Sequence, residues 1–148
     1  MLAESAVRHV YEFHRFLEQW LGGAMPRDRA AVHAQIGNFD PGFQCLPPDG
    51  RVQTRDALLT WLLDAFGSQP GLSIGIEKVN VRRTCEDMVL LTYEERQLRP
   101  KESNRRLSSA VFVASPGGTG AGRWFHLHEV ALDDASSNPP AAPRTDRI

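Results

Sequence analysis

Cysteine is scarce in this chain, and its scarcity excludes several classes of small protein. The sequence has 148 residues and 2 cysteines, Cys45 and Cys85, which are too few and too isolated for a disulfide framework or a zinc knuckle. A chain of this length buries a sufficient hydrophobic core without such cross-links. We therefore expect one ordinary globular domain in the reducing cytoplasm.

Long apolar runs and a strong net charge are lacking as well. No stretch approaches the roughly 18 consecutive apolar residues of a membrane-spanning helix, and residues 1–9 lack the apolar segment of a signal peptide. Lys and Arg total 17 against 18 Asp and Glu, for a net charge of −1. Such a charge gives no general attraction to nucleic acid or anionic lipid. We expect no nucleic-acid partner, no membrane association and no cofactor.

Helical periodicity is concentrated in the first half of the sequence. Apolar residues recur every three or four positions over 3–22, 28–36 and 55–66, and glycine follows each segment closely. Thr54 is well placed to cap the third segment with its hydroxyl. Between the second and third segments, the turn-forming residues within 43–53 favour a small hairpin. The sequence therefore predicts three helices with a short hairpin before the third.

In the second half the apolar period changes to two, which indicates strands. The alternation slips in phase around Glu77 and Lys78, which predicts a β-bulge. The predicted strands cover residues 74–81, 88–98, 107–114 and 123–132. Their spacing is typical of long antiparallel hairpins.

This order of elements predicts the fold class. Three N-terminal helices followed by long strands indicate an α+β domain, with the helices packed on one face of a strongly curved antiparallel sheet. The domain is expected to span residues 1–132. Residues 133–148 are rich in Ser, Asn, Pro and Ala and have no apolar face, so they are predicted to form a disordered tail.

Several local phrases, together with this order, resemble the nuclear transport factor 2-like superfamily. The phrases are FQCLPPDGR at 43–51, RDALLTW at 55–61, VLLTYEERQ at 89–97 and RWFHLHEV at 123–130. The last is also similar to the final strand of the calcium/calmodulin-dependent kinase association domain, which has a His-x-His there. The resemblance covers residues 3–132 and points to the SnoaL-like and unknown-function branch, with its cystatin-like cone fold.

The resemblance implies a cone, in which three helices close over a bent sheet and leave an internal pocket. It also implies a homodimer formed through the outer face of the sheet. Isomerases, dehydratases and cyclases share this scaffold with pure binding and association modules, so the fold fixes the place of a site and leaves its chemistry open. Two functions follow: small-molecule binding, with or without acid–base chemistry, and non-catalytic homodimerisation. The ligand is not identified.

Two histidines are the first candidates for chemistry. His126 and His128 are two residues apart on a predicted strand, which places them on one face with Trp124 and Val130. If that face lines the cone, either imidazole can act as a general acid or base near neutral pH. The spacing also suits a metal, but no third ligand is evident, so no metal site is predicted. The alternative is a structural role for both.

Two carboxylates are further candidates. Glu94 and Glu95 alternate across one strand, and periodicity alone does not show which one faces inward. The resemblance to the kinase association domain favours Glu94, whose alternative role is an ion pair on the surface. Asp40 lies before Pro41, near the expected pocket mouth, and its alternative role is that of a turn residue.

Bulky side chains supply candidates for the pocket walls. The residues expected to contact a ligand are Phe43, Trp61, Tyr93 and Trp124. Aromatic residues on such elements more commonly form core. A cone filled by these side chains would favour the association function, whereas an open pocket would favour ligand binding.

Overall fold

The structure, a computed structural model, describes residues 1–133. Three helices and six strands follow one another along the chain. They are α1 (Leu2–Gly22), α2 (Arg29–Ile36), β1 (Phe39–Leu46), β2 (Gln53–Thr54), α3 (Arg55–Asp64), β3 (Ser73–Thr84), β4 (Met88–Leu98), β5 (Ser103–Ala114) and β6 (Gly122–Leu132). The α+β class and the three helices are confirmed. Nearly all of the predicted tail, 133–148, lies outside the described residues, and the domain boundary at 132 stays a prediction.

The sheet is mixed, which corrects the prediction of a wholly antiparallel one. Its strands lie in the order β2-β1-β6-β5-β4-β3, and β1 runs antiparallel to β2 but parallel to β6. A tight turn makes the two strands that it joins antiparallel, but it does not determine how strands distant in the sequence pair. The strands β1 and β6 are distant in the sequence, so their parallel pairing was not predictable from turns. The helices are also not all N-terminal to the strands, because α3 follows β1 and β2.

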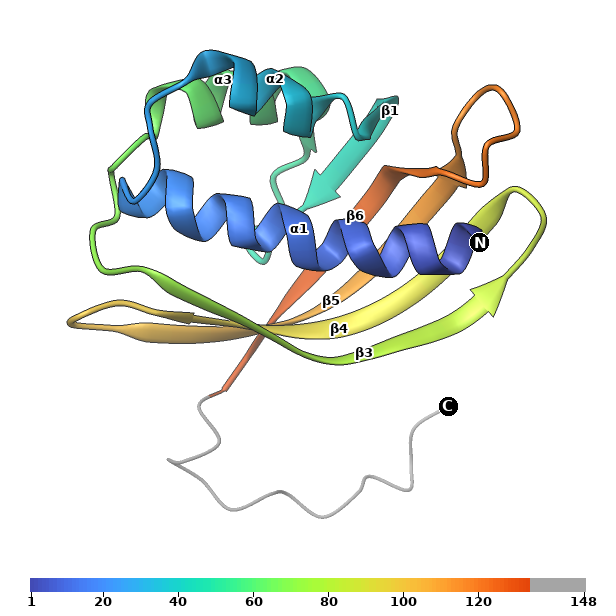
Figure 1. The fold of residues 1–148 in the computed structure, drawn as a ribbon. Coiled ribbons are helices and arrows are strands. Elements are labelled where there is room, and N and C mark those ends of the chain that lie inside the picture. The colour runs from blue at the N-terminus through green and yellow to red at the C-terminus, as the bar shows by residue number, and fades with distance from the viewer. Residues whose placement is uncertain (134–148) are drawn as a thin grey trace, which may run out of the picture.

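The helices cover one face of the curved sheet (Figure 1). The helix α1 packs directly on β3, β4 and β6, while α3 packs against α2 and β1. Thr54 caps α3 as expected, since its hydroxyl accepts the N–H of Ala57 at 3.2 Å. Trp20 links α1 to α3, because its indole N–H donates to the backbone carbonyl of Leu62 at 2.7 Å.

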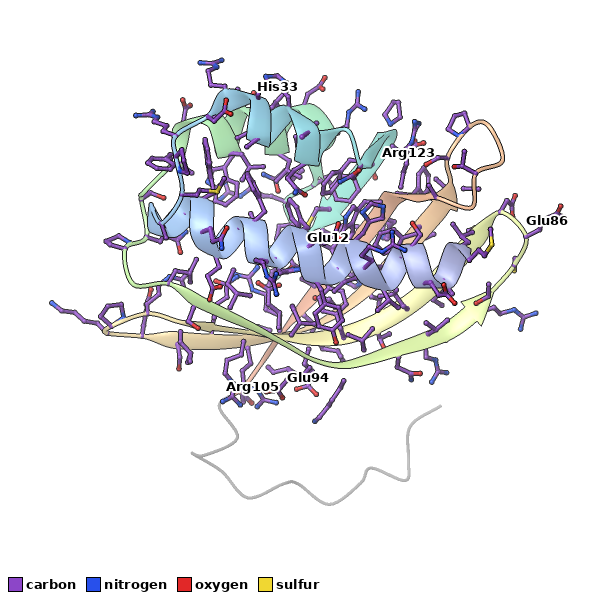
Figure 2. All side chains as sticks on the ribbon, in the orientation of Figure 1. Glu12, His33, Glu86, Glu94, Arg105 and Arg123 are labelled. Atoms are coloured by element: carbon purple, nitrogen blue, oxygen red, sulfur yellow. The ribbon has the colours of Figure 1, made fainter. Side chains whose placement is uncertain are left out.

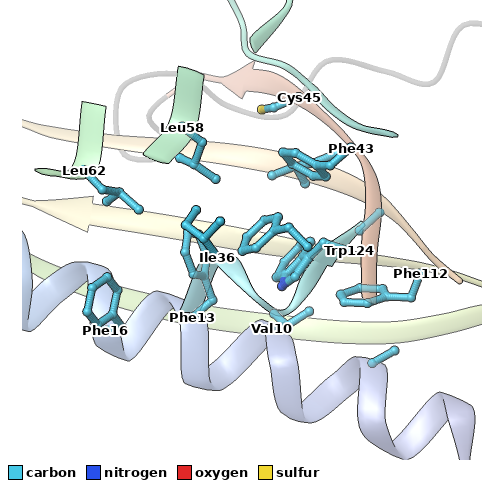
Figure 3. Packing of buried hydrophobic residues seen from close by; sticks show 14 of the residues in the cluster. Val10, Phe13, Phe16, Ile36, Phe43, Cys45, Leu58, Leu62, Phe112 and Trp124 are labelled. Carbon is cyan, nitrogen blue, oxygen red and sulfur yellow. The ribbon is translucent and has the colours of Figure 1, made fainter. Parts of the chain in front are cut away.

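Aromatic side chains from three elements meet under the helices (Figure 3). Phe39 stacks on Trp124 with ring centroids 5.5 Å apart, and it meets Phe13 and Phe43 edge-on at 5.0 and 4.8 Å. These contacts join α1, β1 and β6 into one core. Aromatic pairs of this geometry contribute about 0.5–1.5 kcal/mol each beyond their buried area.

Two bulges set which side chains face the helices. In β3 the register with β4 shifts between Glu77 and Asn80, and Lys78 has a φ of 57°, which confirms the predicted bulge. In β6 a second bulge was not predicted: Trp124 pairs with Phe112 and His126 with Val111, so Phe125 is an extra residue. One extra residue reverses the facing of every side chain beyond it.

The Trp20 contact generates a stability prediction. Replacing Trp20 by Phe removes the indole donor and leaves the Leu62 carbonyl with the backbone N–H of Ala65, at 3.2 Å, as its remaining partner. The smaller ring also leaves space in the core, so we expect a loss of about 1–3 kcal/mol in the free energy of unfolding. Urea denaturation measures it. Trp61→Phe is the matched control, since Trp61 is 41% exposed, and we expect less than about 0.5 kcal/mol there. Equal losses in the two variants would contradict this account.

Candidate functional site

A cavity of about 220 Å³ lies between the helices and the inner face of the sheet. Its apolar walls come from α1, β1, α3, β3 and β6, through the side chains Phe13, Leu17, Leu21, Phe39, Phe43, Leu58, Trp61, Ile74, Trp124 and Leu127. Polar groups from α1, β2, β4, β5, β6 and the α3–β3 and β4–β5 loops complete the lining. The volume corresponds to about seven water molecules, at about 30 Å³ each, which suits a small organic molecule.

Three of the four residues expected at the pocket walls line this cavity. Phe43, Trp61 and Trp124 are part of its surface. Tyr93 is not: it is fully buried, and its ring meets that of His14 edge-on with centroids 5.4 Å apart. The cavity is open despite these aromatic side chains, so they form its walls and do not plug it.

Glu94, the carboxylate expected to line the pocket, faces away from it. Figure 2 shows Glu94 and Arg105 beyond the sheet, on the side opposite the helices. Its oxygens lie 2.7 Å from an Arg105 nitrogen and 2.8 Å from that of Lys78, and these two hydrogen bonds lower the pKa of the Glu94 carboxyl. The next residue, Glu95, faces the cavity instead.

His126 and His128 also lie on the outer face, which corrects their expected position beside Trp124. The bulge at Phe125 separates them from Trp124, so Leu127 and Glu129 are the inward-facing residues of this strand. Among residues 1–133, no three His, Cys, Asp or Glu side chains form a group that suits a metal ion.

Asp40 does not line the cavity. Its carboxylate accepts the backbone N–H of Gly42 at 2.8 Å and lies 3.5 Å from an Arg123 nitrogen. It therefore has the role of a turn residue, the alternative given above. Most of the expected wall residues therefore line the cavity, whereas none of the four expected acid–base groups does.

A buried ion pair forms the inner end of the polar lining. His14 Nε2 lies 3.1 Å from Glu95 Oε1, and His14 Nδ1 lies 2.7 Å from the carbonyl oxygen of Val10. Both ring nitrogens therefore face acceptors, which requires a proton on each when Glu95 is ionised. Burial disfavours the charge on His14, but Glu95 outweighs this and raises the His14 pKa above 6.5. Burial likewise opposes the Glu95 charge, but His14 and Gln97 lower its pKa to about 2.

From Glu95 a chain of hydrogen bonds continues along the inner face of β4. The side-chain nitrogen Nε2 of Gln97 donates to Glu95 Oε2 at 2.6 Å, and Arg99 donates to the side-chain oxygen Oε1 of Gln97 at 2.8 Å. Arg99 also donates twice to the side-chain oxygen Oε1 of Gln69, at 2.9 and 2.6 Å. The spacing of two residues places Glu95, Gln97 and Arg99 on one face.

Arg99 is thus held by neutral groups. Its two partners are amide oxygens, and no carboxylate of residues 1–133 lies within 4.0 Å of its guanidinium. Half-buried arginine usually has an anionic partner, since the charge is costly to desolvate. An uncompensated guanidinium in the lining of a cavity is suited to binding an anion.

A second polar group lies on β6 and β5. Glu129 is 7% exposed, and its two oxygens lie 3.4 and 3.3 Å from Nη1 of Arg106. The thiol of Cys45 lies 3.6 Å from Glu129 Oε1. Burial, followed by the charge and hydrogen bond of Glu129, raises the pKa of the Cys45 thiol to about 12, so this cysteine stays protonated and is no nucleophile.

Sequence patterns did not reveal the polar lining because they did not show which side chains of β4 and β6 face the helices. Val89, Leu91 and Tyr93 form the more apolar face of β4, and extending that face predicts Glu95 and Gln97 inside. Met88 and Leu90 make the other face of β4 partly apolar as well, so the alternation did not identify the inner face. The inward position of Glu129 depends on the bulge at Phe125, for which no sequence pattern was apparent.

Comparisons with known proteins place the fold. No family model and no curated protein matches the sequence. A nuclear transport factor 2-like protein of unknown function from Pseudomonas aeruginosa has a similar structure, with a TM-score of 0.80 and 26% identity over 87% of this chain and 99% of that one. The chain therefore has the nuclear transport factor 2-like fold, as its sequence indicated.

More distant structures agree on the fold alone. A cystatin-like domain of unknown function from Nostoc punctiforme has a TM-score of 0.62 at 17% identity, over 90% of this chain and 79% of that one. The association domain of C. elegans calcium/calmodulin-dependent kinase II has a TM-score of 0.63 at 12% identity, over 86% and 95%. Within residues 1–133, no helix is long and apolar enough to cross a membrane.

The His14–Glu95 pair generates a prediction about stability and pH. Glu95→Gln leaves a buried histidine without its counter-charge, so we expect a loss of about 3–5 kcal/mol near pH 6. The pair contributes fully between pH 4.5 and 6.5. Below pH 4.5 its contribution falls, because the unfolded chain protonates Glu95 there while the folded state does so only near pH 2. Above pH 6.5 it falls because His14 of the unfolded chain is neutral, and it is lost once the folded His14 also gives up its proton. The difference between wild type and variant should therefore shrink at both ends.

Chemical denaturation from pH 3 to pH 9 measures this difference. Glu94→Gln is the matched control, because it makes the same chemical change one residue away on the outer face, and we expect a loss below about 1 kcal/mol. A difference for Glu95→Gln that does not change with pH would contradict the ion pair.

Proposed function

We propose that this protein binds a small molecule with an apolar body and one anionic group, such as a carboxylate, in the cavity between its helices and sheet. The observation that carries this proposal is the Arg99 guanidinium, which lines the cavity and is held by two amide oxygens. A carboxylate offers two acceptors in the geometry that a guanidinium favours.

The balance of charge supports the same ligand class. The cavity lining carries the cations Arg99 and Arg106 and the buried imidazolium of His14, against the carboxyl groups of Glu95 and Glu129. The lining therefore has a net positive charge even when both carboxyl groups are ionised. The aromatic and aliphatic walls favour an apolar body for the rest of the ligand.

Acid–base chemistry of the isomerase, dehydratase or cyclase kind would need a side chain with a free site for a proton. His14 and Glu95 do not offer one, because both nitrogens of the imidazole and both oxygens of the carboxylate are engaged within the network. The other carboxyl group of the lining, Glu129, is paired with Arg106 in the free protein, so binding is the function that the geometry favours.

Binding of a carboxylate depends on Arg99 in this proposal. With benzoate as the probe, we expect Arg99→Gln to weaken binding at least about tenfold, the effect of losing one charged hydrogen-bond donor. Isothermal titration calorimetry measures it. The control Arg96→Gln changes an exposed arginine of β4, the strand that ends just before Arg99, and this variant should bind as wild type does.

Benzyl alcohol, which has the same ring without the charge, should bind more weakly than benzoate to the wild type and equally to both variants. If the alcohol binds as well as benzoate, or if neither binds, the anion-binding proposal is wrong.

A second function, self-association, has an observation of its own. The outer face of the sheet exposes Leu90, Leu107 and Val130, at 36%, 42% and 49%, on three neighbouring strands. The distant structural neighbours include kinase association domains. We propose that this face forms a homodimer, and the cavity on the opposite face would remain accessible in such a dimer.

Light scattering coupled to size-exclusion chromatography tests this. We expect a dimer for the wild type and a monomer for Val130→Glu, because a carboxylate buried in an apolar interface is costly to desolvate. Val52→Glu, at a site that is 55% exposed in the loop before β2, should remain dimeric. A monomeric wild type, or a dimer that survives Val130→Glu, would contradict this interface.

A further inference from the structure

We propose that Glu129 is the proton-exchanging group of the cavity. When an anionic ligand binds, Arg106 pairs with the ligand instead of with Glu129, and Glu129 then binds one proton. This inference rests on the proposed function, since it requires an anionic ligand in the cavity. It places the proton exchange of the cavity on Glu129, which was not among the acid–base candidates Glu94, His126, His128 and Asp40.

The position of Glu129 carries the first step. It lies on the inner face of β6 because the bulge at Phe125 turns that part of the strand over, and it lines the same cavity as Arg99. Its only charged partner in residues 1–133 is Arg106, at 3.3 Å. Both oxygens face one guanidinium nitrogen, Nη1, at 3.3 and 3.4 Å, so the contact is long for an ion pair.

The second step concerns competition for Arg106. This side chain also lines the cavity, with 26% of its surface exposed, so a ligand anion and Glu129 reach the same guanidinium. The Glu129 carboxylate and the carboxylate of a bound ligand would therefore compete for Arg106. A ligand that approaches with better geometry replaces Glu129 as its partner.

The third step concerns the groups that remain around Glu129. From α1 it faces His14, which is already paired with Glu95; from β4 it faces Glu95; and from β1 it faces the neutral thiol of Cys45. Without Arg106, an ionised Glu129 would be buried beside Glu95 and the ligand anion. Like charges in one desolvated site cannot all stay ionised, so the weakest acid takes up a proton.

The balance of the exchange is simple. One ion pair, Arg106 with Glu129, is replaced by another, Arg106 with the ligand. One proton moves from solvent to a carboxylate oxygen of Glu129, so one negative charge enters the cavity with the ligand and one positive charge enters with the proton. Burial already raises the pKa of Glu129 in the free protein, only partly offset by Arg106, and this makes proton uptake easier.

Calorimetry with benzoate tests this directly. Titrations at one pH in buffers of different ionisation enthalpy report the number of protons exchanged on binding. We expect uptake of close to one proton per benzoate at a pH where free Glu129 is ionised. Affinity should then fall up to about tenfold for each unit of rising pH, since one proton is linked to binding.

Glu129→Gln should still bind benzoate, but with no proton uptake and with an affinity that does not change between pH 6 and pH 8. The control Glu77→Gln alters an exposed carboxylate on the outer face and should show the wild-type uptake. Circular dichroism confirms that both variants are folded. Should Glu129→Gln not fold, the same titrations on Glu129→Asp, which retains a carboxyl group, should still show uptake.

The outcomes separate the two proposals. Benzoate that binds the wild type without proton uptake, or uptake that persists in Glu129→Gln, overturns the role of Glu129 and leaves the anion site standing. If benzoate binds the wild type at no pH, the proposed function itself fails.

Discussion

The buried ion pair between His14 and Glu95 is the interaction on which the site depends. Charges inside an apolar domain must be paired and hydrogen-bonded, and this pair uses both ring nitrogens and both carboxylate oxygens to meet that requirement. Because Glu95 is fixed, it orients the amide of Gln97, whose carbonyl oxygen in turn receives Arg99. The cation at the cavity is therefore positioned by a chain of contacts that begins on the first helix.

The two carboxyl groups of the cavity differ because their partners differ. Glu95 has an imidazolium and an amide at short distance and stays ionised, whereas Glu129 has one long contact to Arg106 and a thiol. Two similar groups in one cavity thus take different roles, one structural and one able to exchange a proton. The nuclear transport factor 2-like fold supplies the cavity, and these local partners determine its chemistry.

The sequence predicted the elements far better than it predicted the site. Helical and strand periods located α1, α3 and β4 to within two residues, because burial of one face imposes those periods. The facing of strands was harder: β4 has apolar residues on both sides, so its pattern left the choice between Glu94 and Glu95 open, and the resemblance to the kinase association domain favoured Glu94. The bulge at Phe125 then reversed the expected facing of His126 and His128. The bulge near Lys78 was predicted from a slip in the alternation, but no such slip was apparent around Phe125.

The most direct test of this account is a crystal structure of the protein with benzoate bound. The account predicts that the carboxylate lies within hydrogen-bond distance of Arg99 and that the ring lies among the aromatic walls near Phe43 and Trp61. It also predicts that Arg106 has turned from Glu129 toward the ligand. Benzoate seated on the outer face of the sheet, or in the cavity with its carboxylate away from both arginines, would contradict it.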